Sequence, residues 1–283
     1  MKIVAHIAYF WHETNTSIRS KYIVSVINNY LNTWENITQF DIFIHTNSEQ
    51  ARIIESEFSV GTHMKLYFVV HDLSNENPRN LTWKHRTLME TQKDDYDVFV
   101  YLEDDTGIPS KAFNYWLHYK DIFKDLDIDI GFARVETIDN IDFCCHDILT
   151  PCEGRIDVLD RNFTWNHAMF AAFWICDKEE LEIFMKSVYW KQHGYFPAGP
   201  TQPPSQFIQE SAGIGFKMRD TSFYRGSFYP LDDNNTHISD MCLVYHLANN
   251  YITQPRCAQG KFNYKRMTEN IGNILNTQII LNK

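Results

Sequence analysis

The stretch YDVFVYLEDDTGIP, residues 96–109, joins an apolar strand to three consecutive acidic residues. Its apolar run from 98 to 102 is typical of a strand that is buried on both faces of a parallel sheet. Glu103, Asp104 and Asp105 follow at once, so their carboxylates should project together from the carboxyl end of that strand. Like charges at such short range repel each other, and either a bound divalent cation or a solvated turn would accommodate them.

Three more pairs of strand and helix patterns alternate ahead of this stretch. Strands are predicted over 2–10, 40–47 and 64–70, and helices over 18–34, 48–58 and 80–93, the second with Ser48 as its N-cap. With the strand at 96–102, this order predicts an α/β fold with a mostly parallel sheet and right-handed crossovers. Ligands of such sheets bind beyond the carboxyl ends of the strands. We therefore expect one crevice, lined by Tyr9 to Glu13, Thr46 and Asn47, His71 and Asp72, and Glu103 to Asp105.

The rest of the chain is less regular. The patterns predict a helix over 110–125, a strand over 128–137, a hairpin near Glu153 and Gly154, a strand over 165–176, a helix from Asp177 and a strand over 240–247. The segment HGYFPAGPTQPPSQ, residues 193–206, is rich in Gly and Pro and predicts a loop. We expect a single domain over 1–283, with an alternating half over 1–137 and an irregular half over 138–283.

Composition limits the classes of function. The chain has 283 residues, and its 26 Lys and Arg against 36 Asp and Glu give a net charge of −10. Because no run of basic residues offsets this charge, it argues against non-specific binding to nucleic acid. The sequence shows neither a transmembrane stretch nor a signal peptide, so we expect a cytoplasmic protein whose six cysteines are reduced. A zinc site built from Cys144, Cys145, His146 and Cys152 is an open alternative.

The sequence resembles the GT-A glycosyltransferase superfamily, whose members carry an acidic D-x-D motif between an apolar strand and a helix. The resemblance rests on LTWKHRTLMETQKDDYDVFVYLEDD (81–105), GFARVE (131–136) and VYHLANNY (244–251). It implies a GT-A fold with a Rossmann-like nucleotide-binding half over 1–137 and an acceptor-binding half with a C-terminal tail over 138–283. The implied activity is transfer of a hexosyl or pentosyl group from a nucleotide-diphosphate sugar, of UDP or GDP type, to a hydroxyl of a glycan or glycoprotein.

The resemblance also implies a metal site. Glu103, Asp105 and the late His246 would hold Mn²⁺ or Mg²⁺, which neutralises the diphosphate of the donor. Asp104 belongs to the implied catalytic residues. Taken alone, His246 is better explained as a buried structural histidine, and His237 is its rival for the metal.

Further residues are implied to bind the donor, namely Tyr9, Arg19, Asn47, His85, Arg86 and Arg134. Arg86 offers a fork of hydrogen-bond donors to phosphate, and His85 offers a neutral hydrogen bond to base or sugar. Neighbouring helix residues point about 100° apart, so only one of these two side chains can face the crevice squarely. Structural alternatives stay open: core packing for Tyr9, and a solvated ion pair with a nearby acid for Arg86. Arg134 and Glu136, which lie on one face of a strand, could equally form ion pairs with their neighbours.

An inverting transferase needs a general base to take the proton of the acceptor hydroxyl. Glu210 in QFIQESAGIGF has the order and context of that base. Many GT-A enzymes carry this acid at the start of the helix, where this chain has Ser205 and Gln206. The base and the stereochemistry therefore stay open, with Asp142, Asp147 and Asp157 as alternatives.

Two other functions remain in view. A sugar-1-phosphate nucleotidyltransferase needs a Gly-rich phosphate loop after the first strand, and FWHETNTS, residues 10–17, has no glycine. A non-catalytic module of the same fold would bind a nucleotide sugar or carbohydrate without turning it over.

Overall fold

The computed structural model describes residues 1–14, 16–125, 129–138, 141–144, 153–166, 172–187, 190, 227–235 and 238–250. These residues form two compact units, which are described separately below. The first contains the described residues of Met1–Thr106 and Ala172–Phe223, and the second those of Gly107–Ala171 and Tyr224–Lys283. The sequence was expected to divide into halves over 1–137 and 138–283. The two units differ from these halves because the chain leaves the first unit after Thr106 and returns to it at Ala172.

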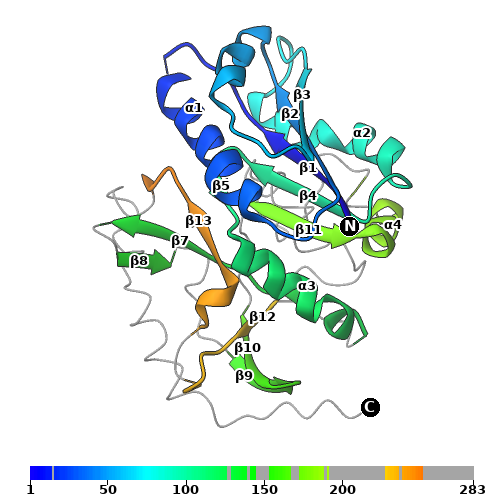
Figure 1. Cartoon of the computed structure of the whole chain (residues 1–283), viewed down its shortest axis with the longest axis vertical. Coiled ribbons are helices and arrows are strands. Elements are labelled where there is room, and N and C mark those ends of the chain that lie inside the picture. Colours follow the sequence, from blue (N-terminus) through cyan, green and yellow to red (C-terminus); the bar gives the residue numbers. More distant parts are fainter. Residues whose placement is uncertain are drawn as a thin grey trace, which may run out of the picture. The chain divides into compact units, whose positions relative to one another are not determined.

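Among the described residues, the first unit has a five-stranded sheet in the order β11-β4-β1-β2-β3 (Figure 1). Its strands are β1 (Lys2–Ala8), β2 (Gln39–Thr46), β3 (Met64–Val70), β4 (Val98–Glu103) and β11 (Phe173–Asp177). β1 pairs in parallel with β2 and β4, β2 pairs in parallel with β3, and β11 runs antiparallel to β4. The predicted α/β fold with a mostly parallel central sheet is confirmed.

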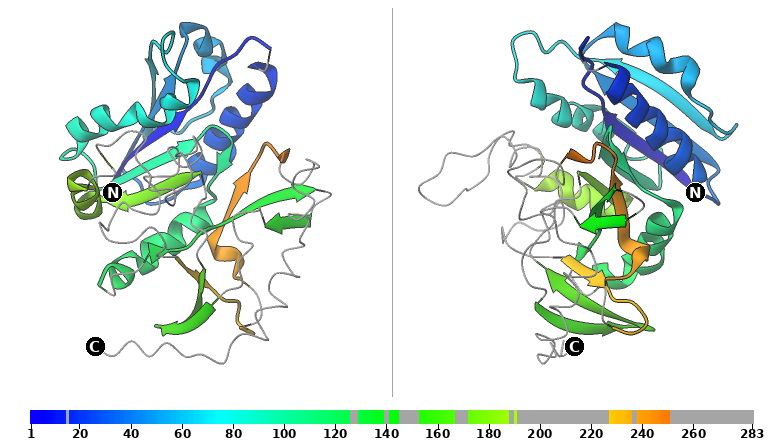
Figure 2. Two further views of the ribbon diagram at one scale, coloured as in Figure 1. Left: turned by 180° about the vertical axis from the view of Figure 1, so that it is seen from behind. Right: turned by 90° about the vertical axis from the view of Figure 1, so that its left-hand side faces the viewer.

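Helices cover both faces of this sheet, with α1 (Thr16–Ser25) on one face and α2 (His85–Gln92) on the other (Figures 1 and 2). The remaining helical segments of the unit are η1 (Val26–Tyr30), η2 (Leu31–Thr33), η3 (Glu49–Glu57), η4 (Pro78–Trp83) and α4 (Lys178–Lys186). The helix predicted over 18–34 is therefore α-helical only as far as Ser25. It continues as a π-helical turn that contains Asn28 and Asn29, whose side chains donate to the Glu57 carbonyl and the Ser25 hydroxyl.

Local sequence explains where two of these helices begin. Ser48 caps η3 as predicted, because its side chain accepts a hydrogen bond from the Gln50 amide at 3.2 Å. Asp177 starts α4 with a reciprocal capping box. Its carboxylate accepts from the Glu180 amide at 2.9 Å, and the Glu180 carboxylate accepts from the Asp177 amide at 3.0 Å.

The apolar layer on the α2 face of the sheet is the part of the core that matters for the site. Its buried members from the strands and the helices that cover them include Val4, Leu81, Met89, Phe99, Tyr101, Trp174, Phe184 and Trp190. A polar group buried in this layer is costly unless the protein itself supplies a hydrogen-bond partner.

The second unit consists of α3 (Ser110–Asp125) and short strands. They are β6 (Asp129–Ile130), β7 (Ala133–Ile138), β8 (Ile141–Cys144), β9 (Glu153–Val158), β10 (Arg161–Asn166), β12 (Ser227–Pro230) and β13 (Leu243–His246), preceded by η6 (Asp240–Cys242). A further two-residue strand, β5 (Thr106–Gly107), lies at the boundary between the units. β6, β12, β10 and β9 form one sheet in that order, while β7 pairs in parallel with β13 and antiparallel with β8.

Several predicted boundaries in this region are wrong. The strand predicted over 240–247 begins only at Leu243, because Asp240–Cys242 form η6. The strand predicted over 128–137 is divided at Gly131, where β12 approaches so closely that a Cβ would lie 2.8 Å from the Phe228 carbonyl oxygen. The hairpin turn lies at Leu159, which has a left-handed φ of 54°, while Glu153 and Gly154 belong to β9. The strand predicted over 165–176 is divided between β10 and β11, which belong to different units.

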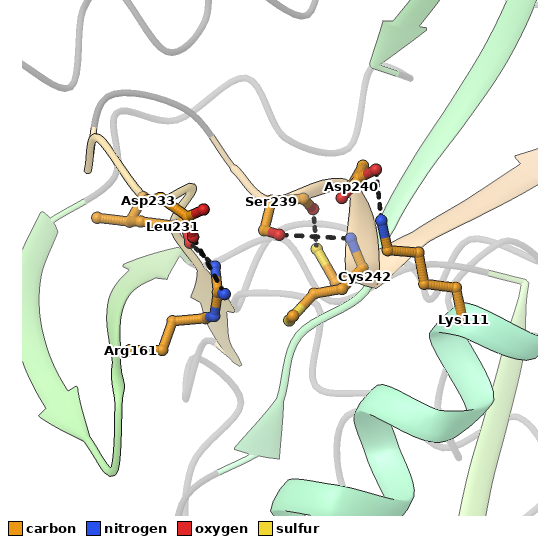
Figure 3. Close-up of polar contacts among 8 residues, drawn as sticks. Lys111, Arg161, Leu231, Asp233, Ser239, Asp240 and Cys242 are labelled. Atoms are coloured by element: carbon orange, nitrogen blue, oxygen red, sulfur yellow. Dashed lines mark hydrogen bonds and ion pairs between the residues drawn. The ribbon is translucent and has the colours of Figure 1, made fainter.

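Polar contacts hold the loop that precedes β13 (Figure 3). Arg161 donates to the Leu231 carbonyl at 2.7 Å, and Lys111 of α3 pairs with Asp240 at 2.5 Å. The Cys242 thiol donates to the Ser239 carbonyl at 3.3 Å, and burial raises the pKa of this thiol to about 12. Cys242 and Cys176 are free and buried. Within the described residues, no helix has the length and apolar character that crossing a bilayer requires.

Candidate functional site

The segments that follow the parallel strands meet at one edge of the first sheet. In the strand register Ala8 lies opposite both His45 and Glu103, so β1, β2 and β4 end level with one another. Backbone hydrogen bonds continue past the strand ends, from Tyr9 N to His45 O at 2.9 Å and from His71 N to Thr46 O at 2.8 Å. The strand ends therefore meet at one edge as predicted, whereas the crevice that residues 9–13, 46–47, 71–72 and 103–105 should line stays a prediction.

The acidic triplet begins at the last residue of β4. Asp104 is completely buried, and its two carboxylate oxygens accept hydrogen bonds from Nε and Nη2 of Arg19, the former at 2.8 Å. This bidentate ion pair joins the start of α1 to the end of β4. The arginine predicted near the nucleotide therefore has a partner inside the protein, while its side chain stays 37% exposed.

Burial and charge oppose each other at this pair. Burial raises the pKa of Asp104 above its ordinary value, although the guanidinium of Arg19 favours the ionised carboxylate. Burial alone would lower the pKa of Arg19, but the Asp104 carboxylate raises it above its ordinary value. Arg19 therefore stays protonated and supplies a positive charge directly beneath the triplet.

The other two acids are the ones with the chemistry of metal ligands. Asp105 is nearly buried and Glu103 is half-buried. Among the residues that the structure describes, no group of three or more His, Cys, Asp or Glu side chains is arranged to hold a metal ion. His246 belongs to the second unit, so the predicted set of Glu103, Asp105 and His246 is not tested, and the metal stays a prediction.

Two predicted donor-binding residues are used within the protein at the end of β1. Tyr9 is completely buried, with its hydroxyl 3.1 Å from the Ser20 hydroxyl. The Asn47 amide bonds the backbone of Trp11 in both directions, accepting from its N–H at 2.8 Å and donating to its carbonyl at 3.1 Å. Asn47 therefore fixes the segment after β1, and its predicted contact with a base stays untested.

His85 and Arg86 both lie inside the apolar core of the first unit. The His85 ring stacks on Tyr101 with centroids 4.4 Å apart, and neither ring nitrogen has a hydrogen-bond partner of ordinary geometry. Burial lowers the pKa of His85 well below its ordinary value, and the Arg86 charge lowers it further. Arg86 donates to the Trp190 carbonyl at 2.8 Å and lies 3.7 Å from the Trp83 ring centroid, while burial lowers its pKa to about 9. Helix geometry allowed only one of this pair to face the crevice squarely, and the structure buries both, so their predicted contacts with the donor stay untested.

The late histidine belongs to the second unit. His246 Nδ1 lies 2.5 Å from a carboxylate oxygen of Glu136, and both side chains are buried. Arg134, two residues earlier on β7, is also buried. Glu136, which the sequence set beside Arg134, is thus the partner of His246. The metal role of His246 and the donor role of Arg134 stay predictions.

Several predicted residues lie outside the described part of the chain. They are Glu210 with Ser205 and Gln206, His237, Asp147, and Cys145, His146 and Cys152 of the zinc alternative. Of the alternative bases, Asp142 accepts a hydrogen bond from the Thr137 hydroxyl at 2.6 Å, and Asp157 lies on β9.

A chain of histidines crosses the sheet, and the sequence did not identify it as part of the site. His6 Nε2 lies 3.0 Å from Gln92 Oε1, His6 Nδ1 lies 2.8 Å from His45 Nε2, and His45 Nδ1 lies 2.8 Å from His71 Nε2. Burial lowers the pKa of His6 to about 3 and that of His45 well below its ordinary value. The sequence did contain a signal for this chain, because each of the first three predicted strands carries a histidine within it or directly after it.

No protein-family model matches the sequence, and no curated protein matches it. Solved structures do match. One is the crystal structure of S. aureus TarS, with 10% identity over 97% of this chain and 43% of that chain, at a TM-score of 0.39. Another is mouse xyloside xylosyltransferase 1 in its apo form, with 12% identity over 48% of this chain and 53% of that chain, at a TM-score of 0.29.

The chain spans about half the length of these two proteins or less. Because both TM-scores lie below 0.5, neither likeness carries an argument about activity. The fold class rests on the strand order and pairing of the first sheet.

Proposed function

We propose that the chain is a metal-dependent glycosyltransferase of GT-A type. It would transfer a sugar from a nucleotide-diphosphate sugar, of UDP or GDP type, to a hydroxyl of a glycan or glycoprotein. The observation that carries the proposal is the position of Glu103, Asp104 and Asp105 at the carboxyl end of β4, level with the ends of β1 and β2. The sequence resemblance at the same residues supports it.

The donor set fits a hard divalent cation. Both oxygens of Asp104 accept from Arg19, so we assign Glu103 and Asp105 as the carboxylate ligands. Mg²⁺ is commonly bound by one or two carboxylates together with the phosphates of the substrate, so the protein itself need not supply three. When bound, Mn²⁺ or Mg²⁺ stabilises the negative charge that develops on the leaving diphosphate.

The chain's own residues have the following proposed roles. Arg19 holds Asp104 and so fixes the backbone of the triplet, and its partly exposed guanidinium attracts the diphosphate. Asn47 orders the segment after β1 that borders the same edge. Glu210 remains the proposed general base, and His246 the proposed third ligand.

A non-catalytic module that binds nucleotide sugars is the second candidate. One observation favours it, because Arg19 already supplies a positive charge to the triplet without any metal. Such a module would bind donor with little dependence on metal and would not hydrolyse it.

The experiment that tests the proposal is calorimetric titration of UDP- and GDP-sugars with and without Mn²⁺, together with measurement of slow donor hydrolysis. Asp105→Asn should weaken metal-dependent binding at least tenfold, because it removes a charged ligand. Asp94→Asn is the matched control, since Asp94 lies on the surface and pairs with Lys178 at 2.6 Å. Metal-independent binding without hydrolysis would favour the module, and no binding of any nucleotide sugar would overturn both proposals.

A further inference from the structure

We infer that His6, His45 and His71 form a directional hydrogen-bond chain that presents Nδ1 of His71 as a neutral acceptor for an N–H or O–H group of the ligand. In this arrangement His71 is a ligand-binding residue, while His6, His45 and Gln92 are positioning residues. The inference rests on the proposed function, because it concerns the nucleotide that binds at the same sheet edge.

The direction of the chain follows from its buried end. Gln92 presents its Oε1 to His6 Nε2 at 3.0 Å, and a carbonyl oxygen can only accept, so His6 Nε2 must carry the hydrogen. A neutral imidazole has one donor and one acceptor nitrogen. His6 Nδ1 therefore accepts from His45 Nε2 at 2.8 Å, and His45 Nδ1 accepts from His71 Nε2 at 2.8 Å.

The rings are held neutral by their surroundings. His6 and His45 are completely buried, between the sheet and α2, and a second proton on either would bring two N–H groups face to face. His71 is half-buried, and burial lowers its pKa, with a further lowering by Lys84 and a partial reversal by Glu76. Lys84 and Glu76 form an ion pair at 2.7 Å, so their effects on His71 largely cancel.

The last acceptor lies where the ligand is expected. His71 follows β3 directly, and its amide bonds the Thr46 carbonyl at the end of β2. Its ring is nearly coplanar with that of His45, with centroids 5.1 Å apart and an interplanar angle of 11°, as expected for a hydrogen bond between ring nitrogens. Among the described residues, Nδ1 of His71 has no hydrogen-bond partner.

The first test measures the hydrogen-bond direction in the free protein. Two-bond ¹H–¹⁵N correlation spectra of the ¹⁵N-labelled full chain at pH 7.5 distinguish protonated from unprotonated ring nitrogens. We expect protonated Nε2 and unprotonated Nδ1 in His6, His45 and His71. The opposite tautomer at His71 means that the chain runs in the reverse direction, and this result overturns the inference.

The second test adds UDP or GDP with Mg²⁺ to the full chain. We expect the Nδ1 resonance of His71 to shift, and His71→Phe to weaken nucleotide binding roughly tenfold because it keeps an aromatic ring and loses the acceptor. His118→Phe, at an exposed position of α3 in the second unit, is the control and should bind as the wild type does.

Gln92→Met tests the positioning role without altering a residue that contacts ligand. It removes the acceptor at the buried end, so His71 should become a mixture of both tautomers and bind nucleotide less tightly. Gln92→Glu retains an acceptor and should restore the single tautomer. If nucleotide binds without shifting the His71 resonances, and binds His71→Phe and Gln92→Met as tightly as the wild type, this inference alone is overturned. Failure of any nucleotide to bind would overturn the proposed function and the ligand role of His71 with it.

Discussion

Replacement of His85 by phenylalanine should stabilise the first unit. His85 is 1% exposed and stacks on Tyr101, and both of its ring nitrogens are buried without a hydrogen-bond partner of ordinary geometry. A buried polar group left unsatisfied costs about 1–3 kcal/mol. The larger phenyl ring adds an overpacking cost of about 1 kcal/mol. We therefore expect His85→Phe to raise the free energy of unfolding by about 1 kcal/mol at pH 7.5.

The gain should increase on acidification. Burial lowers the pKa of His85 well below 6.5, so the folded state keeps this ring neutral while the unfolded state binds a proton as the pH falls. Stability from this group is thus fully present above about pH 6.5 and is lost as the pH falls below it. Each pH unit is worth about 1.4 kcal/mol, so the wild type should lose about 2 kcal/mol more than His85→Phe between pH 7.5 and pH 5.

Urea unfolding followed by tryptophan fluorescence at the two pH values measures both effects, because Trp174 and Trp190 lie beside His85. His118→Phe is the control for loss of an exposed histidine. Equal losses of stability for wild type and His85→Phe on acidification would refute the reasoning. Nucleotide titration of the same variant also tests the donor-binding role that the sequence implied for His85, since unchanged affinity would make it a packing residue.

Four further outcomes are expected. Burial lowers the pKa of His6 from 6.5 to about 3, so the stability that neutral His6 contributes should be lost as the pH falls from 6.5 to 3. In acid titrations of unfolding, the wild type should therefore lose more stability over this pH range than His6→Phe does. Arg19→Met should destabilise the chain by roughly 2–3 kcal/mol in urea, because it leaves buried Asp104 without its cation, and adding Asp104→Asn should recover part of the loss. Asp177→Ala should cost about 1 kcal/mol through loss of the helix cap, whereas Asp177→Asn should cost less. The Cys242 thiol should resist Ellman's reagent at pH 8 until denaturant is added, and a native protein whose reactive thiol count falls by one in Cys242→Ala would contradict this.

The sequence predicted the first sheet well because its strands are nearly continuous apolar runs separated by amphipathic helices. The same patterns located the helix starts at Ser48 and Asp177, where a side chain competes directly for the first free amides. The division of 128–137 was not predictable, because it depends on the close approach of β12 to Gly131 from a distant part of the sequence.

In the candidate site, too, the sequence did not reveal contacts between residues that are distant along the chain. Residue order alone brought the strand ends together, since parallel register places them at one edge. It did not reveal that Arg19 pairs with Asp104, that Asn47 binds the Trp11 backbone, or that His85 is buried. All three depend on contacts between residues far apart in sequence, and the residue types alone are equally compatible with ligand binding.

The place of β11 in the first sheet has a consequence for synthesis of the chain. β4 acquires β11 as its neighbour only after the whole segment from Gly107 to Ala171 has left the ribosome. Until then the hydrogen-bonding groups of Val98 to Leu102 form an open strand edge of strongly apolar sequence, which is prone to pair with other chains. Chains truncated before Phe173 should therefore aggregate. Folding of the full chain should depend on whether the open edge of β4 is kept from other chains until β11 has been synthesised.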